Sequence, residues 1–276
     1  MEYKNISNFK VSVIGLGTHL IGGKAEADYS KDKEYIELIK KAAELGINHI
    51  DTAEIYGNGH SEEIIGKAIK DLDRKELFIA SKVCSANLKH DDLLNSLKNS
   101  LKRLQTNYLD LYYVHYPNPE ISLKETMNAL EEAMHKKMIR NIGLSNFSSQ
   151  LLEEAQSYLK DFSISAVQVE YNLLKQEAKE TLLPFCKSKN IILVSYRPLA
   201  KGQIVSMKND EIDLLSKKYN KTKAQIALNW LVQQENVIAI PKVSNFDHLT
   251  ENIDSLNFKI KKEDLEKLSV IKPNLN

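Results

Sequence analysis

The feature that most constrains the fold of this chain is a regular alternation of short apolar runs with longer segments of helical period. Eight runs rich in β-branched and aromatic residues have the length of strands, and they lie at residues 11–17, 47–51, 77–82, 109–115, 139–145, 165–171, 191–196 and 237–242. Segments between them repeat apolar residues every three or four positions, as at 33–46, 62–72, 92–104, 123–136, 149–159, 179–190 and 224–235. This alternation predicts a mostly parallel sheet covered by helices, with strands buried on both faces.

Eight such units can close into a barrel or open into a doubly wound sheet, and the first turn helps to separate the two. An open dinucleotide-binding sheet carries G-x-G-x-x-G there, but Gly15 and Gly17 are followed by Leu20 where the third glycine belongs. A length of 276 residues suits a barrel of about 250 residues. We therefore predict a single (β/α)8 TIM barrel domain over residues 1–276, with a short strand or hairpin at 1–10 and an added helix at 262–271.

Local signals mark the ends of some of these helices. Ser61 with Glu63 is expected to open one helix, and Ser122 with Glu125 is expected to form a capping box on another. Gly46 is expected to end the first long helix. The single tryptophan, Trp230, lies within a helical run and is expected in the core.

Composition argues against several classes of protein. The 38 Lys and Arg residues nearly balance the 37 Asp and Glu residues, so we expect neither nucleic acid nor a membrane as a partner. The N-terminus lacks the apolar region of a signal peptide, which predicts a cytoplasmic location. Cys84 and Cys186 are too few for a disulfide framework and are expected to be inert, and the seven histidines show no metal-binding spacing, so no metal is expected.

Polar residues stand where successive strands are expected to end. Asp51, Lys82 and His115 end the second, third and fourth runs, and Tyr56 follows in the turn after the second. Similar positions after later strands hold Ser145, Asn146, Gln168, Tyr171, Tyr196 and Lys242. In a (β/α)8 barrel, the active site is built at this end of the strands, so these side chains are expected to surround one site.

The first four of these residues suit proton transfer to a carbonyl oxygen. A free tyrosine has a pKa of ~10, and an adjacent ammonium lowers it because it favours the phenolate. Lys82 is expected to lower the pKa of Tyr56 in this way, and Asp51 is expected to keep a buried Lys82 charged. His115 can then hydrogen-bond to the carbonyl oxygen and orient the substrate.

Beyond these four residues, the sequence resembles the aldo-keto reductase family. The motifs DTAEIYGNG, IASK, DLYYVHYP, NIGLSNF, AVQVEYN, VSYRPLA and AIPKVSNFDHLTENI appear in the family's order, from residue 13 to residue 252. The resemblance implies a barrel that binds NADP without a Rossmann domain and reduces aldehydes or ketones reversibly. It also implies that Asp51, Tyr56, Lys82 and His115 are catalytic, with Tyr56 as acid in reduction and as base in oxidation.

The same resemblance assigns the cofactor residues. Ser145, Asn146 and Gln168 are implied to bind the nicotinamide carboxamide, and Tyr196 to stack on the nicotinamide ring. Lys242 is implied to meet the adenosine phosphate. Further contacts are expected at Gly17, Thr18, Asp51, Pro198, Leu199, Val243, Ser244, His248, Glu251 and Asn252. Arg197 stands where a serine is common in the family, and two roles remain open for it: a contact with the cofactor pyrophosphate, or a solvated surface position.

Two departures from the family's pattern affect the cofactor phosphate. Val243 stands where a serine or threonine is common, and His248 stands where an arginine is common. A neutral imidazole is a weaker phosphate partner than a guanidinium. Because Lys242 is present, we expect NADPH to be preferred over NADH.

The substrate residues are expected at the mouth of the barrel. His19 and Tyr116 stand where relatives carry bulky aromatic residues, and with Tyr56 and His115 they are expected to bind a small carbonyl substrate. The short chain end KPNLN predicts an open site for small or aromatic aldehydes, α-dicarbonyls and sugar-derived aldehydes. We expect a monomer or a weak homo-oligomer.

Two alternative functions remain open from the sequence. A regulatory nucleotide-binding subunit of the same fold would bind the cofactor with little turnover. A lyase or isomerase would use Lys82 as a Schiff-base amine, but this role leaves Tyr196, Asn146 and Lys242 unexplained.

Overall fold

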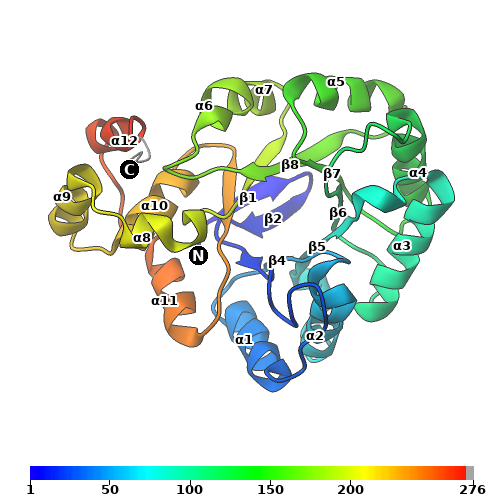
Figure 1. Cartoon of the computed structure of the whole chain (residues 1–276), viewed down its shortest axis with the longest axis horizontal. Coiled ribbons are helices and arrows are strands. Elements are labelled where there is room, and N and C mark those ends of the chain that lie inside the picture. The colour runs from blue at the N-terminus through cyan, green and yellow to red at the C-terminus, as the bar shows by residue number, and fades with distance from the viewer. Residues whose placement is uncertain (272–276) are drawn as a thin grey trace.

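The computed structural model describes residues 1–271, and its centre is a barrel of eight parallel strands (Figure 1). The strands follow one another around the barrel in chain order. They are β3 (Leu16–Gly17), β4 (His49–Asp51), β5 (Phe78–Val83), β6 (Leu111–Val114), β7 (Ile142–Ser145), β8 (Ile164–Glu170), β9 (Ile192–Tyr196) and β10 (Val237–Ile240). The expectation drawn from the chain end KPNLN concerns residues 272–276, which lie outside the described residues.

The first and last strands complete the barrel. The segment around β3 pairs in parallel with the segment around β10 through Ile14 with Ala239 and Gly17 with Lys242. The Gly17 amide donates a 3.0 Å hydrogen bond to the Pro241 carbonyl. This closure, together with the helices that follow the strands, confirms the predicted (β/α)8 barrel.

Helices surround the barrel on its outer face (Figure 1). Those between or after strands are α1 (Asp32–Glu44), α2 (His60–Ile69), α3 (His90–Arg103), α4 (Leu123–His135), α5 (Ser149–Tyr158), α6 (Glu177–Thr181), α7 (Leu183–Ser188), α8 (Gln203–Ser206), α9 (Asp210–Tyr219), α10 (Lys223–Val232), α11 (Phe246–Asp254) and α12 (Lys262–Leu268). Short 3-10 turns are η1 (Tyr56–Gly59), η2 (Arg74–Glu76), η3 (Ser85–Asn87) and η4 (Ala200–Gly202). In the described part of the chain, no helix has both the length and the apolarity that a membrane span needs.

The N-terminal segment forms a hairpin. Strands β1 (Tyr3–Ile6) and β2 (Phe9–Ser12) pair antiparallel. The predicted first strand, 11–17, was therefore wrong in its bounds, since its first two residues belong to this hairpin and the barrel strand β3 is Leu16–Gly17, with Ile14 adding a single bridge to Ala239. Apolar periodicity alone does not reveal the break, because the whole run is buried.

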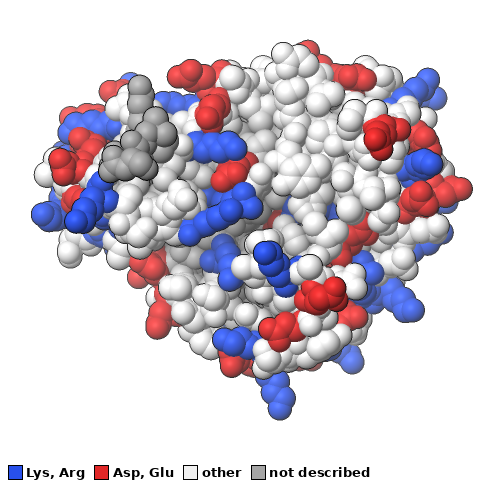
Figure 2. All heavy atoms as spheres, viewed as in Figure 1, with Lys and Arg blue, Asp and Glu red and all other residues white. Residues whose placement is uncertain are grey.

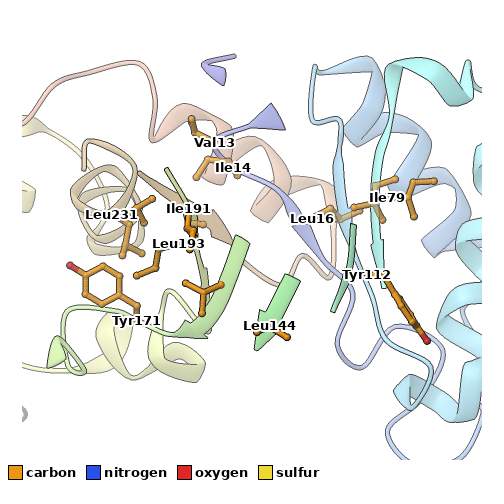
Figure 3. Packing of buried hydrophobic residues seen from close by; sticks show 14 of the residues in the cluster. Val13, Ile14, Leu16, Ile79, Tyr112, Leu144, Tyr171, Ile191, Leu193 and Leu231 are labelled. Atoms are coloured by element: carbon orange, nitrogen blue, oxygen red, sulfur yellow. The ribbon is translucent and has the colours of Figure 1, made fainter. Parts of the chain in front are cut away.

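Two apolar layers hold the barrel together. The inner layer fills the barrel with inward-facing strand residues and two hairpin residues, and it consists of Ile6, Val11, Phe78, Ala80, Leu111, Tyr113, Ala166, Ile192, Val194, Ile238 and Ile240. The outer layer packs the other face of the strands against the helices, as seen for Leu16, Ile79, Leu144 and Leu193 (Figure 3). Successive side chains of a strand point alternately into the barrel and toward the helices. Knowing which way one side chain points therefore predicts which way its neighbours on the strand point.

Candidate active site

The residues of the site follow the inward-facing residues of each strand, two positions farther along the chain. Phe78 and Ala80 face the barrel interior, so Lys82 does too, and Ala166 likewise sets the direction of Gln168. These rows end in polar groups at the carboxyl ends of the strands. The hydrophobic filling of the barrel therefore stops where the candidate site begins.

Asp51 and Lys82 form a buried ion pair at the end of neighbouring strands. The Lys82 ammonium lies 2.5 Å from Asp51 Oδ1 and donates a 2.8 Å hydrogen bond to the Thr52 carbonyl. Lys82 is fully buried and Asp51 is 2% exposed. Burial by itself would lower the pKa of Lys82, but the charge of Asp51, with smaller contributions from Tyr56 and from hydrogen bonds to both residues, outweighs it and the pKa is raised. Lys82 therefore carries its charge, as expected.

Tyr56 reaches this pair from the turn η1 that follows β4. Its ring centroid lies 5.3 Å from the Lys82 ammonium. The turn needs glycine at its second position, because Gly57 has a φ of 55° and a Cβ there would lie 2.2 Å from the Gly22 carbonyl oxygen. The close packing of η1 on the loop after β3 thus fixes the position of Tyr56.

The Lys82 ammonium lowers the pKa of Tyr56, as predicted, but the opposing effect of burial is larger and was not predicted. Burial raises the pKa of Tyr56 above its usual value, and the charge of Asp51 adds to the rise, while the Lys82 ammonium opposes it. The phenol of the free protein is therefore protonated at neutral pH. The sequence analysis counted the charges around Tyr56 but not the burial of its ring.

His115 lies next to Tyr56, and the two ring centroids are 6.0 Å apart. Burial lowers the pKa of His115 to about 3, with further lowering by the charges of Lys82 and His19. The imidazole is neutral at physiological pH. Tyr116 stacks on it with ring centroids 5.1 Å apart, and the His19 ring meets the edge of Tyr56 at 5.2 Å.

His19 and Tyr116 are exposed beside the buried groups. The pKa of His19 is lowered by burial first and then by several nearby cations. The face seen along the barrel axis in Figure 2 is hollowed near its centre, and Lys and Arg side chains border the hollow. The structure thus brings both predicted substrate residues next to Tyr56 and His115.

The amide groups after β7 and in β8 are already hydrogen-bonded within the site. Asn146 donates a 3.0 Å bond to the His115 carbonyl and accepts a 2.9 Å bond from the Tyr196 hydroxyl. Gln168 donates a 2.8 Å bond to Asp51 Oδ2. Sequence reasoning did not anticipate this last bond, although the shared inward direction of Asp51 and Gln168 was a usable signal.

The backbone around β3 and β4 adds a second set of bonds. Thr18 donates to the Asp51 carbonyl from its amide at 3.0 Å and from its hydroxyl at 2.9 Å. Ser145 is buried at the end of β7 and accepts a 3.0 Å bond from the Asn146 amide. Gly17 is buried beside the chain after β10. These residues therefore lie around the same mouth.

The segment after β9 carries the next group of predicted cofactor residues. Arg197 is exposed and lies 3.3 Å from Glu170. Pro198 is buried and Leu199 is half-buried in the turn that leads into η4. The Arg197 guanidinium thus has an acidic partner in the structure.

A further group lies at the start of α11. Lys242, Ser244 and His248 are exposed, and Ser244 Oγ lies 3.2 Å from His248 Nδ1. Val243 is 1% exposed, so its side chain packs in the core and only its backbone is available to a ligand. Farther along α11, Glu251 is half-buried and Asn252 is buried.

Tyr171 does not belong to the site. It is one residue beyond β8, and it follows the outward-facing row of Val167 and Val169. Its hydroxyl donates to Gln234, and its ring packs 5.3 Å from Trp230 in the helix layer. Placing Tyr171 with Gln168 at the mouth was wrong because the two residues differ by an odd number of positions. The expectation that Trp230 is a core residue is confirmed.

Comparisons with known proteins agree with the barrel fold. The sequence matches the aldo/keto reductase family over residues 13–272. It is 34% identical over 268 residues to the methylglyoxal reductase DkgB of Escherichia coli O157:H7, covering 96% of this chain and 94% of that protein. The fold superposes with a TM-score of 0.93 on a thermostable aldo-keto reductase, Tm1743, crystallised with epalrestat, at 44% identity and covering 98% of this chain and 99% of that one. An aldo-keto reductase from Klebsiella pneumoniae in complex with NADPH gives a TM-score of 0.87 at 30% identity, covering 96% of this chain and 93% of that one.

Proposed function

Because the chain belongs to the aldo/keto reductase family, we propose that it reduces aldehydes and ketones to alcohols with NADPH, reversibly, and that Tyr56 is its proton donor. The observation that carries the proposal is the meeting of Tyr56, Lys82, Asp51 and His115 at one mouth of the barrel. A buried ion pair beside a phenol and a neutral imidazole suits proton transfer to a carbonyl oxygen.

The residues at the mouth fit a nicotinamide. Amide groups of Asn146 and Gln168 can bond a carboxamide, with the Ser145 hydroxyl beside them. The Tyr196 ring is held by its hydroxyl bond to Asn146 and offers an aromatic face for stacking. When bound there, NADPH supplies a hydride to the carbonyl carbon.

The residues near α11 fit the phosphate of the adenosine half. Lys242 gives a full positive charge, while Ser244 and His248 give polar atoms that face each other at 3.2 Å. Lys242 supports a preference for NADPH over NADH. The NADPH complex of the Klebsiella pneumoniae relative supports the same choice.

The catalytic roles follow from the charges described above. Tyr56 is protonated in the free protein, since its pKa lies above its ordinary value, so it carries a proton for the developing alkoxide. The Lys82 ammonium opposes the effect of burial on this pKa and therefore favours the transfer. The Lys82 ammonium stabilises the phenolate that remains, and Asp51 holds that ammonium in place. The neutral His115 can donate one hydrogen bond to the same oxygen and fix its direction.

The substrates that suit this mouth are small carbonyl compounds. His19 and Tyr116 place two exposed aromatic rings beside the buried catalytic groups. The similarity to a methylglyoxal reductase supports α-dicarbonyls as one substrate class. We therefore propose activity on α-dicarbonyls and on small or aromatic aldehydes.

The deciding experiment follows NADPH and NADH oxidation with methylglyoxal and an aromatic aldehyde, in the wild type and in Tyr56→Phe. We expect the wild type to turn over and Tyr56→Phe to lose at least about a hundredfold in kcat, in line with the loss of general acid catalysis, while it still binds NADPH. A wild type that binds NADPH but reduces neither substrate would favour a regulatory nucleotide-binding role.

A second experiment tests the Schiff-base alternative. Lys82 is fully buried and charged, and it is bonded to Asp51 and Thr52, whereas a Schiff-base amine must be neutral and accessible. Borohydride in the presence of methylglyoxal should therefore leave no adduct on Lys82. A trapped adduct on Lys82 would replace the reductase proposal by a lyase.

A further inference from the structure

One bond in the site crosses the whole barrel. Asp51 ends β4 and Gln168 lies in β8, and these two strands are four positions apart in a ring of eight. Even so, the Gln168 amide nitrogen lies 2.8 Å from Asp51 Oδ2. Both residues are 2% exposed, so the bond lies in the interior of the barrel.

This bond completes the coordination of the Asp51 carboxylate. Oδ1 faces the Lys82 ammonium on the adjacent strand β5, and Oδ2 faces the Gln168 amide from the opposite wall. With a donor on each oxygen, the plane of the carboxylate is fixed. A carboxylate with only one partner could rotate away from the ammonium or exchange that partner.

We propose that Gln168 is a positioning residue for the Asp51–Lys82 ion pair, acting across the barrel through its bond to Asp51. The inference rests on the proposed reductase function and deepens it, because the pair supports the acid Tyr56. Gln168 has a second N–H and a carbonyl oxygen, so the bond to Asp51 leaves it groups for a carboxamide. It would therefore join the nicotinamide pocket to the proton-transfer groups.

The consequence concerns the charge of Lys82. Burial disfavours the ammonium and Asp51 favours it, so a less well-placed carboxylate makes Lys82 lose its proton at lower pH. The titratable or charged groups that face Lys82 are Asp51 and His49 on β4, Tyr56 on η1, Tyr113 on β6, and His115 and His19 in the loops. Among these, Gln168 hydrogen-bonds to the Asp51 carboxylate, and it also lies close to the hydroxyl of Tyr113. Burial raises the pKa of Tyr113 well above its usual value, so that phenol stays neutral and Asp51 is the charged group that Gln168 positions.

The test replaces Gln168 by methionine, which keeps the length of the side chain but removes the amide. Tyr196→Phe is the control, since it alters the same nicotinamide pocket and Tyr196 contacts Asn146 rather than Asp51. Three quantities are measured: the Kd for NADPH, the pH profile of kcat/KM, and the 13C NMR titration of Lys82 in the cofactor-free protein. Lysine labelled at Cε gives the signal, and Lys82→Arg assigns it.

In Gln168→Met, we expect the alkaline limb of kcat/KM and the Lys82 resonance to move to lower pH by at least about half a unit. Tyr196→Phe should move neither of them. If Gln168→Met weakens NADPH binding and leaves both titrations in place, Gln168 only binds the cofactor and the inference is wrong. Gln168→Leu repeats the measurement if the methionine variant does not fold.

The two proposals fail in different ways. If the wild type reduces no carbonyl compound, the proposed function fails, and the Lys82 resonance of the cofactor-free protein decides the inference by itself. An unshifted resonance in Gln168→Met would overturn the positioning role even in an active enzyme.

Discussion

At the scale of single residues, the site combines two kinds of group with different sequence signals. Asp51, Lys82 and Gln168 extend inward-facing rows of strand residues, so their direction follows from the alternation along each strand. The pKa of Tyr56 could not be obtained in this way. Burial of a ring in a loop depends on which distant segment covers it, and here the segment around Gly22 packs against η1.

The phosphate end of the proposed cofactor site gives the first prediction at this scale. We expect His248→Arg to strengthen NADPH binding relative to NADH by about fivefold, or about 1 kcal/mol, because a guanidinium forms paired, charge-assisted hydrogen bonds with phosphate. Titration of both nucleotides against the wild type and the variant measures the ratio of Kd values. His248→Ala is the control and should lower that ratio or leave it unchanged. An unaltered ratio in His248→Arg would place the phosphate away from α11.

At the scale of elements, the residues that precede α10 and α4 are expected to contribute differently to the free energy of unfolding. Thr222 and Gln225 form a complete capping box on α10, with bonds of 3.2 and 3.0 Å. The predicted capping box of Ser122 and Glu125 was wrong: Ser122 precedes α4 without a side-chain capping bond, and Glu125 accepts the backbone amide of His90 at the start of α3. We expect Thr222→Ala to lower the free energy of unfolding by about 1 kcal/mol and Ser122→Ala by clearly less.

Urea denaturation of the two alanine variants makes this comparison. Glu125→Ala extends it, since that change removes a partner of a neighbouring helix and should cost more than Ser122→Ala. Equal losses in Ser122→Ala and Thr222→Ala would mean that Ser122 caps α4 in solution.

The capping pattern also shows where sequence reasoning reached its limit. The eight strands and the barrel were predictable because their signal is local and repeated. Gly46 ends α1 as predicted, with a φ of 90°. Ser61 is the second residue of α2, as a helix start there predicted, but Gly59 holds the cap position and the Ser61 hydroxyl bonds to Thr18. Competition from distant partners cannot be read from a motif of three or four residues.

At the scale of the whole molecule, the N-terminal hairpin packs into the inner core of the barrel. Ile6 and Val11 are buried with Phe78 and other interior residues, although the hairpin is not part of the ring of eight strands. We expect Ile6→Ala to lower the free energy of unfolding by about 2 to 5 kcal/mol, as other large-to-small core changes do. The kcat at temperatures where the protein is folded should change little. Lys10→Ala, an exposed site on the same hairpin, is the control, and equal effects of the two changes would show that Ile6 is not a core residue.

The interior of the barrel also makes stability depend on pH. His49 is fully buried, its two ring nitrogens lack partners among the described residues, and burial lowers its pKa to about 4, with Asp51 raising it and Lys82 lowering it further. The unfolded chain binds a proton at a pKa of ~6.5, so between these two values the unfolded state carries more protons than the folded state. His49 therefore contributes stability that is present above pH ~6.5 and is lost as the pH falls toward 4.

The lost contribution is on the order of 3 kcal/mol, since each unit of pKa difference corresponds to ~1.4 kcal/mol. The pKa of His115 is also lowered, to about 3, so protonation of this residue destabilises the folded state in the same way. The loss of folding stability therefore extends to about pH 3. We expect urea denaturation at pH 7, 6, 5 and 4 to show a steep fall in the free energy of unfolding, and His49→Phe to flatten it between pH 6 and 4. A variant whose stability falls as steeply as that of the wild type would show that His49 is not held in its neutral form. The acid sensitivity of the barrel would then come from its carboxylates.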